Sequence, residues 1–179
     1  MITAGSIREY LKKVKLPRLI VIKQWCFKIL QGLEFLHQYS LVHGKLTCES
    51  IYINSNNGDI KIGDLGIRQI PLYNSKQSEI HQSILLKNEK KTCKYDIYCF
   101  GLVLLEMISS DIPVPHAFKY LCKLINMGCK DKVINMVENE QFRDILVVTL
   151  NENPDQRIAV QELQNHSFFN KTKQDHKAI

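Results

Sequence analysis

The sequence predicts a mainly α-helical domain that contains one small β-hairpin. Over most of the chain, apolar residues recur at spacings of three and four, which is the period of helices with one buried face. The period changes where two isoleucine-rich runs, residues 51–53 and 60–62, flank a cluster of turn-forming residues. The 179 residues, 45% hydrophobic and 23% charged, suffice for one globular domain with a real core.

Two helices are expected before the hairpin. Ser6 and Glu9 have the spacing of a capping box, and apolar residues follow at helical spacing until Pro17. From Arg18 to about Tyr39, a longer apolar stripe predicts a second helix with one buried face. The stripe consists of Ile22, Trp25, Cys26, Ile29, Leu30, Leu33 and Leu36.

A polar segment and an apolar helix are expected after the hairpin. Residues 66–94 are polar and weakly periodic, which predicts a long loop, and loops of that length are usually functional or flexible. Residues 96–108 are apolar on nearly every side, so we expect a helix that lies among other helices. We assign residues 1–170 to one domain and residues 171–179 to a polar tail. The remaining helical patterns are separated by breakers at Pro113, Pro115, Gly128 and Pro154.

Composition and charge exclude several classes of protein. The net charge of +6 comes from lysines scattered over three regions without interleaved aromatic residues, which favours a solvated surface over a nucleic-acid interface. Glu106 interrupts the longest apolar run, which falls short of the roughly 18 residues that cross a bilayer. The six cysteines form no C-x-x-C pair, so buried reduced thiols are expected rather than a zinc site. Since no signal peptide is readable, we expect a cytoplasmic protein without membrane or nucleic-acid partners.

Two motifs lie on either side of the predicted hairpin. Residues 43–50 have the sequence HGKLTCES, where protein kinases carry the catalytic loop H-R-D-L-x-x-x-N. The spacing from Lys45 to Ser50 equals that from the aspartate to the asparagine of that motif. The hairpin ends in residues 62–66, IGDLG, which resemble the metal-binding D-F-G with Leu65 in place of phenylalanine.

Two further markers follow in the order that kinases have. Residues 96–101, DIYCFG, resemble the start of the central kinase helix, and residues 153–157 and 165–169 resemble the closing arginine segment and last helix. The IGDLG motif, together with Trp25 and Cys26 of the long helix, resembles the corresponding sequences of the WNK (with-no-lysine) kinases. Three short motifs, HG at residues 43–44, LTC at 46–48 and DIY at 96–98, resemble even more closely the WNK-related pseudokinases called nuclear receptor-binding proteins. The resemblance covers about residues 3–170 and implies the C-terminal lobe of a protein kinase fold.

The same resemblance implies that the N-terminal lobe is absent from this sequence. Met1 falls where kinases have the hinge, so the residues present include no Gly-rich loop, no strand lysine for the phosphates and no partner glutamate. An incomplete gene model and a chain that consists of the large lobe alone are both open explanations.

The chain departs from the kinase pattern at the positions that transfer phosphate. Lys45 occupies the position of the carboxylate base, and an ammonium with a pKa of about 10.4 has no free lone pair at neutral pH. Ser50 replaces the asparagine that would hold a second magnesium, Thr47 replaces the lysine aimed at the γ-phosphate, and Gly44 replaces an arginine. Only Asp64 keeps its polar role, so the resemblance implies that ATP and Mg²⁺ bind weakly or not at all. Thr47 as loop filler and Ser50 as a satisfied turn hydroxyl are the alternatives.

Residues that hold the kinase scaffold survive in this chain. The resemblance implies that His43 packs against Leu65 of the metal-binding loop. It also implies that Asp96 accepts hydrogen bonds from the backbone at His43 and Gly44. The structural positions are therefore expected to persist without the catalytic ones.

Two side chains are expected to occupy the empty cleft. Tyr52 lies at the position of the adenine floor, where its ring could stack on a base but is better suited to packing in the core. We expect Lys45 to form an ion pair with Asp64 or Glu49, and a solvated lysine is the alternative.

Arg157 lacks the glutamate partner that the corresponding arginine has in kinases. In kinases the arginine of this segment pairs with the glutamate of A-P-E, and counting back from the central helix places Ile84 there. A buried guanidinium without a counter-charge is costly. We therefore expect Arg157 to be exposed or bonded to a substitute such as Glu79 or Glu89.

These features favour a catalytically impaired kinase-like lobe, a pseudokinase that acts as a scaffold by binding other proteins. The alternative is a working serine/threonine kinase represented here by an incomplete chain. A truncated product without independent stability is a third possibility, for which the exposed cleft would predict aggregation.

Overall fold

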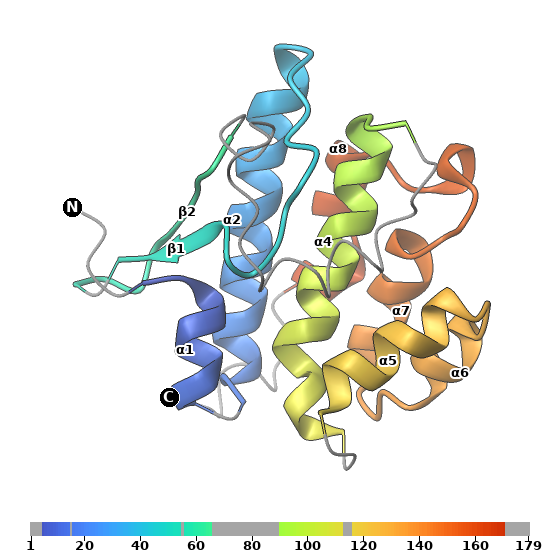
Figure 1. The fold of residues 1–179 in the computed structure, drawn as a ribbon. Helices are drawn as coiled ribbons and strands as arrows, with labels where there is room; N and C mark the ends of the chain where they lie inside the picture. Colours follow the sequence, from blue (N-terminus) through green and yellow to red (C-terminus); the bar gives the residue numbers. More distant parts are fainter. Residues whose placement is uncertain (1–4, 15, 55, 66–89, 113–115, 171–179) are drawn as a thin grey trace, which may run out of the picture.

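The computed structural model describes residues 5–14, 16–54, 56–65, 90–112 and 116–170. Within them the protein is mainly helical with one two-stranded sheet, as the sequence predicts (Figure 1). Most of the expected loop and the whole C-terminal tail lie outside the described residues. None of the described helices has both the length and the apolar character needed to cross a bilayer.

The two predicted N-terminal helices are confirmed. Helix α1 spans Ile7–Lys13, and its capping box is complete because Ser6 Oγ accepts from the Glu9 N–H while the Glu9 carboxylate accepts from the Ser6 N–H. Helix α2 spans Leu19–Gln38 and buries the predicted apolar stripe from Ile22 to Leu33. Leu36, the last predicted member of the stripe, is only partly buried because it lies near the end of the helix.

The hairpin pairs strand β1, Ile51–Ile53, with strand β2, Ile60–Ile62, in antiparallel register. Ile51 and Ile53 are buried, whereas Tyr52 between them is only partly buried, since successive side chains of a strand point to opposite faces. Strand β2 lies against α2, and the indole N–H of Trp25 donates to the Gly58 carbonyl in the turn at 3.0 Å. This contact fixes the hairpin beside the long helix.

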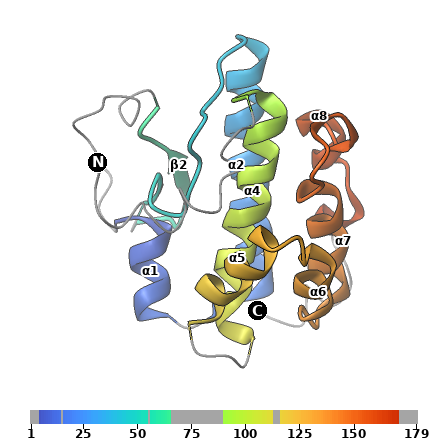
Figure 2. The same cartoon turned by 45° about the vertical axis from the view of Figure 1, so that its right-hand side comes forward.

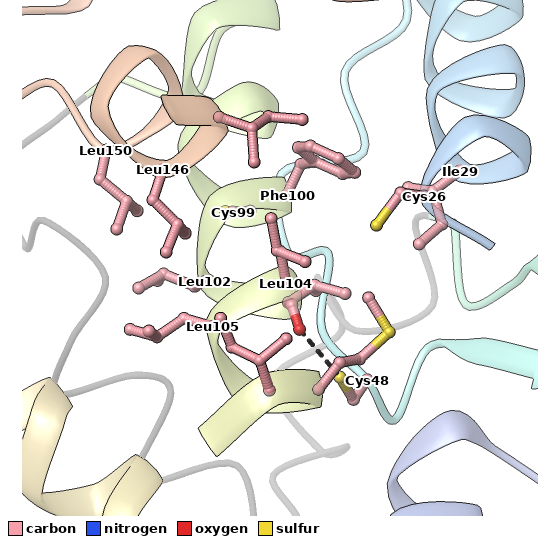
Figure 3. Close-up of a cluster of buried hydrophobic side chains, with 14 of the residues drawn as sticks. Cys26, Ile29, Cys48, Cys99, Phe100, Leu102, Leu104, Leu105, Leu146 and Leu150 are labelled. Carbon is pink, nitrogen blue, oxygen red and sulfur yellow. Dashed lines mark hydrogen bonds between the residues drawn. The ribbon is translucent and has the colours of Figure 1, made fainter. Parts of the chain in front are cut away.

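Helix α4, Cys93–Ile108, lies between α2 and α7 (Figure 2). Every residue from Tyr95 to Leu105 is buried, as expected for a helix among helices. The predicted loop reached residue 94, but the helix begins at Cys93 because the Thr92 side chain accepts from the Tyr95 N–H and caps it. The cluster in Figure 3 shows this core, in which the Cys48 thiol also contacts the Val103 carbonyl.

Short helices complete the domain after α4. Helix α7 packs on α4, while α8 packs on α2, so the last part of the chain closes the core. The bounds are η3 Ser109–Asp111, α5 Ala117–Asn126, α6 Lys130–Asn135, α7 Glu140–Thr149, η4 Pro154–Gln156, α8 Val160–Gln164 and η5 Ser167–Phe169.

None of the six cysteines, all of which lie in the described part of the chain, forms a disulfide. Cys93 and Cys129 are only partly buried, so the expectation of burial is wrong for these two. They lie at the start of a helix and after one, where packing is incomplete. Burial raises the pKa of the Cys26 and Cys122 thiols, which keeps these two protonated and unreactive.

Gly101 of α4 packs tightly against the end of α7. A Cβ atom at Gly101 would lie 2.6 Å from Thr149 Oγ1 and 2.8 Å from Leu150 Cδ2, and both residues are fully buried. We expect Gly101→Ala to lower the free energy of unfolding by about 1 to 3 kcal/mol through overpacking, measured by urea denaturation. Gly32→Ala in α2 is the matched control, because its Cβ would meet only the tip of Ile62. It should change stability by no more than about 1 kcal/mol, in the stabilising direction.

Candidate functional site

The loop at residues 43–50 is fixed to the central helix by one buried carboxylate. Asp96 has no exposed surface, and its Oδ2 and Oδ1 accept from the backbone N–H groups of His43 at 2.9 Å and Gly44 at 2.8 Å. These are the two hydrogen bonds that the resemblance implies. His37 Nε2 lies 2.9 Å from the same Oδ2 and adds a third polar contact from α2. Helix α4 thereby sets the position of the whole loop.

His43 connects this loop to the end of the hairpin. The imidazole is 2% exposed, and its Nδ1 accepts from the Lys45 N–H at 3.3 Å. Nε2 therefore carries the proton of the neutral ring and donates to the Gly63 carbonyl at 3.0 Å. Leu65 lies two residues further on and is 44% exposed. The packing of His43 against Leu65 stays a prediction.

The Ser50 hydroxyl closes a turn of the loop upon itself. Ser50 Oγ accepts from the Thr47 N–H at 3.0 Å and donates to the Thr47 carbonyl at 2.9 Å, and Ser50 has no exposed surface. The satisfied turn hydroxyl was one of the two alternatives, and the structure confirms it. Thr47 is 1% exposed, and its Oγ1 finds no hydrogen-bond partner in the described part of the chain. In this conformation both residues are buried.

Asp64 follows the hairpin in a backbone conformation that is uncommon outside glycine. Its φ angle is +60°, and the Tyr52 hydroxyl donates to its Oδ1 at 3.1 Å. The Tyr52 ring packs on Gly63, where a Cβ atom would lie 2.7 Å from ring Cε2. The structure thus brings Tyr52 and Asp64 together, with the ring against the loop backbone.

Glu49 has a partner that the sequence did not predict. Arg8 of α1 donates from Nη1 to Glu49 at 2.7 Å, and from Nε and Nη2 to the two carboxylate oxygens of Glu106 at 2.7 and 2.9 Å. Burial acts to lower the pKa of Arg8, but the hydrogen bond and charge of Glu106 and the charge of Glu49 outweigh it and raise the pKa. The expected ion pair of Lys45, which is half-buried, with Asp64 or Glu49 stays a prediction.

A sequence feature could have pointed to this cluster. Glu106 is the one charge within the apolar run of residues 100–108. A buried charge requires a counter-charge, and Arg8 follows a buried isoleucine at the start of α1. Sequence alone, however, offers many basic residues as candidates.

Arg157 is buried, which excludes the first of its two expected alternatives, an exposed side chain. Its exposed fraction is 1%, and its guanidinium donates to the carbonyls of Asn151 at 2.6 Å, Lys94 at 3.2 Å and Glu152 at 3.3 Å. The guanidinium carbon also lies 4.8 Å from the centre of the Tyr98 ring. Carbonyl dipoles and an aromatic face compensate the charge. The alternative partners, residues 79 and 89, lie outside the described residues, as does residue 84.

A magnesium site of the kinase type does not fit these residues. Mg²⁺ requires several oxygen ligands in nearly octahedral geometry. Asp64 offers a carboxylate, but the Ser50 hydroxyl is enclosed in its own turn, and Lys45 adds a positive charge to the loop. Over the described ranges, no three His, Cys, Asp or Glu side chains gather as a metal-binding group.

The fold and these contacts define a kinase-like helical domain. A buried aspartate of the central helix holds a histidine-containing loop, and a hairpin beside it ends in Asp-Leu-Gly. The chain belongs to the protein kinase domain family, which it matches over residues 1–169.

The chain is similar to serine/threonine kinases of the WNK group. It is 31% identical to "Serine/threonine-protein kinase Wnk" of Drosophila melanogaster and 30% identical to "Serine/threonine-protein kinase WNK3" of Mus musculus, each over 177 residues. It is also 30% identical over 180 residues to "Serine/threonine-protein kinase pkpA" of Phycomyces blakesleeanus. Each comparison covers 94% of this chain but only 7%, 10% and 29% of the respective relative. The chain thus spans less than a third of these relatives, and their similarity confirms the WNK-like part of the resemblance.

Proposed function

We propose that this chain is the C-terminal lobe of a pseudokinase of the nuclear receptor-binding protein type, and that it acts in the cytoplasm by binding other proteins. The observation that carries the proposal is the buried Ser50 hydroxyl. It stands at the position of the second magnesium ligand, yet it has no exposed surface and its hydrogen bonds are made to the Thr47 backbone. A hydroxyl in this arrangement has no access to a cation.

The residue at the catalytic-base position supports the same function. Lys45 has no carboxylate to accept a hydroxyl proton, and loss of a general base alone lowers a rate by about 10² to 10⁴. Thr47 is buried and cannot extend to a phosphate. Since phosphoryl transfer depends on positioning and charge, these changes together leave little catalysis.

The scaffold of the lobe, by contrast, is intact. Asp96 holds the loop with two backbone hydrogen bonds, and Arg157 closes the C-terminal segment with three carbonyl contacts. A fold that keeps its structural contacts while its catalytic positions change is suited to presenting a surface to other proteins.

A serine/threonine kinase of which this chain is one part is the second candidate. It is favoured by the Asp64 carboxylate at the metal-binding position, and by relatives whose names are all serine/threonine-protein kinases. Its ATP and Mg²⁺ would then be held with the help of residues outside this sequence.

A phosphoryl-transfer assay separates the two functions. The purified chain, and the full-length product of its transcript, are incubated with radiolabelled ATP, Mg²⁺ or Mn²⁺ and a mixed peptide substrate. We expect incorporation no greater than that of the Asp64→Asn variant, with circular dichroism showing that both are folded. Incorporation that Asp64→Asn abolishes would instead establish the kinase. As a pseudokinase, the wild type and Asp64→Asn should capture the same partner proteins, and calorimetry with the purified partners should give equal affinities.

A further inference from the structure

Tyr52 contacts the residues that follow the hairpin through both its ring and its hydroxyl, and packing in the core would need only the ring. It projects from the face of β1 opposite to the buried Ile51 and Ile53, and it is only partly buried. Its hydroxyl reaches Asp64 Oδ1 at 3.1 Å, across twelve positions of sequence. The absence of a side chain at Gly63 makes room for the ring, because a Cβ there would lie within 3.0 Å of two ring carbons.

The backbone on both sides of this contact is fixed. The Gly63 N–H donates to the Ser50 carbonyl at 2.8 Å, and the Gly63 carbonyl accepts from His43 Nε2 at 3.0 Å. Asp64 then adopts a left-handed conformation, with φ of +60°. Strained conformations of this kind persist where the surroundings over-determine them, and they concentrate at functional sites. Here the result is a carboxylate that is held with one oxygen directed at a phenol.

We propose that the Tyr52 hydroxyl is an internal ligand of the Asp64 carboxylate, which it holds in place of a divalent cation and thereby keeps the metal affinity of the site low. The inference deepens the proposed function and rests on it, since a lobe that transfers no phosphate has no need of a bound metal. The partly positive hydrogen of the phenol lies against a lone pair of the Asp64 oxygen that a cation would otherwise use. Ser50, at the position of the second metal ligand, is enclosed in its own turn. Of the two metal-ligand positions of the kinase motifs, only Asp64 then offers a carboxylate. The metal affinity therefore depends on whether the Tyr52 hydroxyl or a cation occupies this carboxylate.

Removing the hydroxyl while keeping the ring tests the inference. Tyr52→Phe preserves the packing on Gly63 and removes the phenol hydrogen bond to Asp64 Oδ1. Because a hydrogen bond to a charged group has a net strength equivalent to about a tenfold change in an equilibrium constant, we expect Tyr52→Phe to bind Mn²⁺ about tenfold more tightly than the wild type. The probe is Mn²⁺ alone, and the electron paramagnetic resonance signal of the free ion gives the dissociation constant.

Two further variants make the outcome specific. Tyr120→Phe removes the hydroxyl of a 38% exposed tyrosine on α5 and should leave the Mn²⁺ affinity unchanged. Adding Asp64→Asn to Tyr52→Phe should abolish the gain, since the gain acts through the carboxylate. Thermal unfolding of each variant shows that the proteins compared are folded.

Equal Mn²⁺ affinity in the wild type and Tyr52→Phe would overturn the inference, as would a gain that persists in the Asp64→Asn background. Neither result bears on the proposed function, which fails on phosphate incorporation instead. A lobe that phosphorylates peptides yet shows the tenfold gain would keep the Tyr52 contact and lose the pseudokinase assignment.

Discussion

Replacing Asp96 with alanine is expected to lower the free energy of unfolding by about 2 to 6 kcal/mol, because two buried donors lose their acceptor at about 1 to 3 kcal/mol each. The donors are the backbone N–H groups of His43 and Gly44, at 2.9 and 2.8 Å from the carboxylate. Both residues are buried, as is Asp96 itself, so water cannot replace the lost partner. The contact with His37 Nε2 is lost as well. Urea denaturation followed by circular dichroism measures the change, and a shifted midpoint with an unaltered m-value would show that the variant has lost stability.

Two variants control this experiment. Asp96→Asn keeps the shape and one oxygen, but it turns an N–H₂ group toward one of the two backbone donors, so its loss should be smaller than that of alanine without being negligible. Asp144→Ala removes an exposed carboxylate on α7 and should stay within about 0.5 kcal/mol of the wild type. If Asp96→Ala were as stable as Asp144→Ala, the loop would not depend on the central helix for its position.

The helices and the hairpin could be predicted because their apolar periods are strong and local. The apolar stripe of α2 predicts one buried face, the nearly all-apolar α4 predicts burial on every side, and the observed bounds agree within a few residues. The contacts of Asp96 could be predicted from the family resemblance of the motifs. Periodicity cannot locate a helix boundary that is set by a single capping side chain. The Thr92 cap places the start of α4 at Cys93, within the segment that was expected to be a loop.

The partners of the charged residues could not be predicted, for a physical reason. Arg157 is satisfied by backbone carbonyls, and every residue carries a carbonyl, so no sequence pattern distinguishes these acceptors. The sequence likewise does not distinguish a Ser50 hydroxyl that faces a cleft from one that closes a turn, as it does in the structure. The expected carboxylate partner, Glu79 or Glu89, stays a prediction, because both residues lie outside the described part of the chain.

Arg8→Met is expected to be the second strongly destabilising change, lowering the free energy of unfolding by about 3 to 5 kcal/mol, because it removes the guanidinium that pairs with two mostly buried carboxylates. The guanidinium joins three elements: α1, which carries it, the loop end at Glu49, and α4 at Glu106. The side chains are 15%, 14% and 10% exposed, so solvent screens the pairs only weakly. Urea denaturation at neutral pH measures the loss, and Lys12→Met, an exposed cation on the same helix, is the matched control.

Further variants of Arg8, Glu49 and Glu106 distinguish the net contribution of these ion pairs to stability from the cost of removing one partner. Adding Glu49→Gln and Glu106→Gln to Arg8→Met also removes the two carboxylate charges, and because burying an ion pair often costs about as much as its attraction returns, most of the stability should come back. Arg8→Lys keeps the charge but cannot donate to both oxygens of Glu106 and to Glu49 at once, so it should fall between the wild type and Arg8→Met. A triple variant no more stable than Arg8→Met would show that the guanidinium acts through its packing and hydrogen-bond geometry rather than its charge. In that case the link between α1 and the loop would depend on the shape of this one side chain.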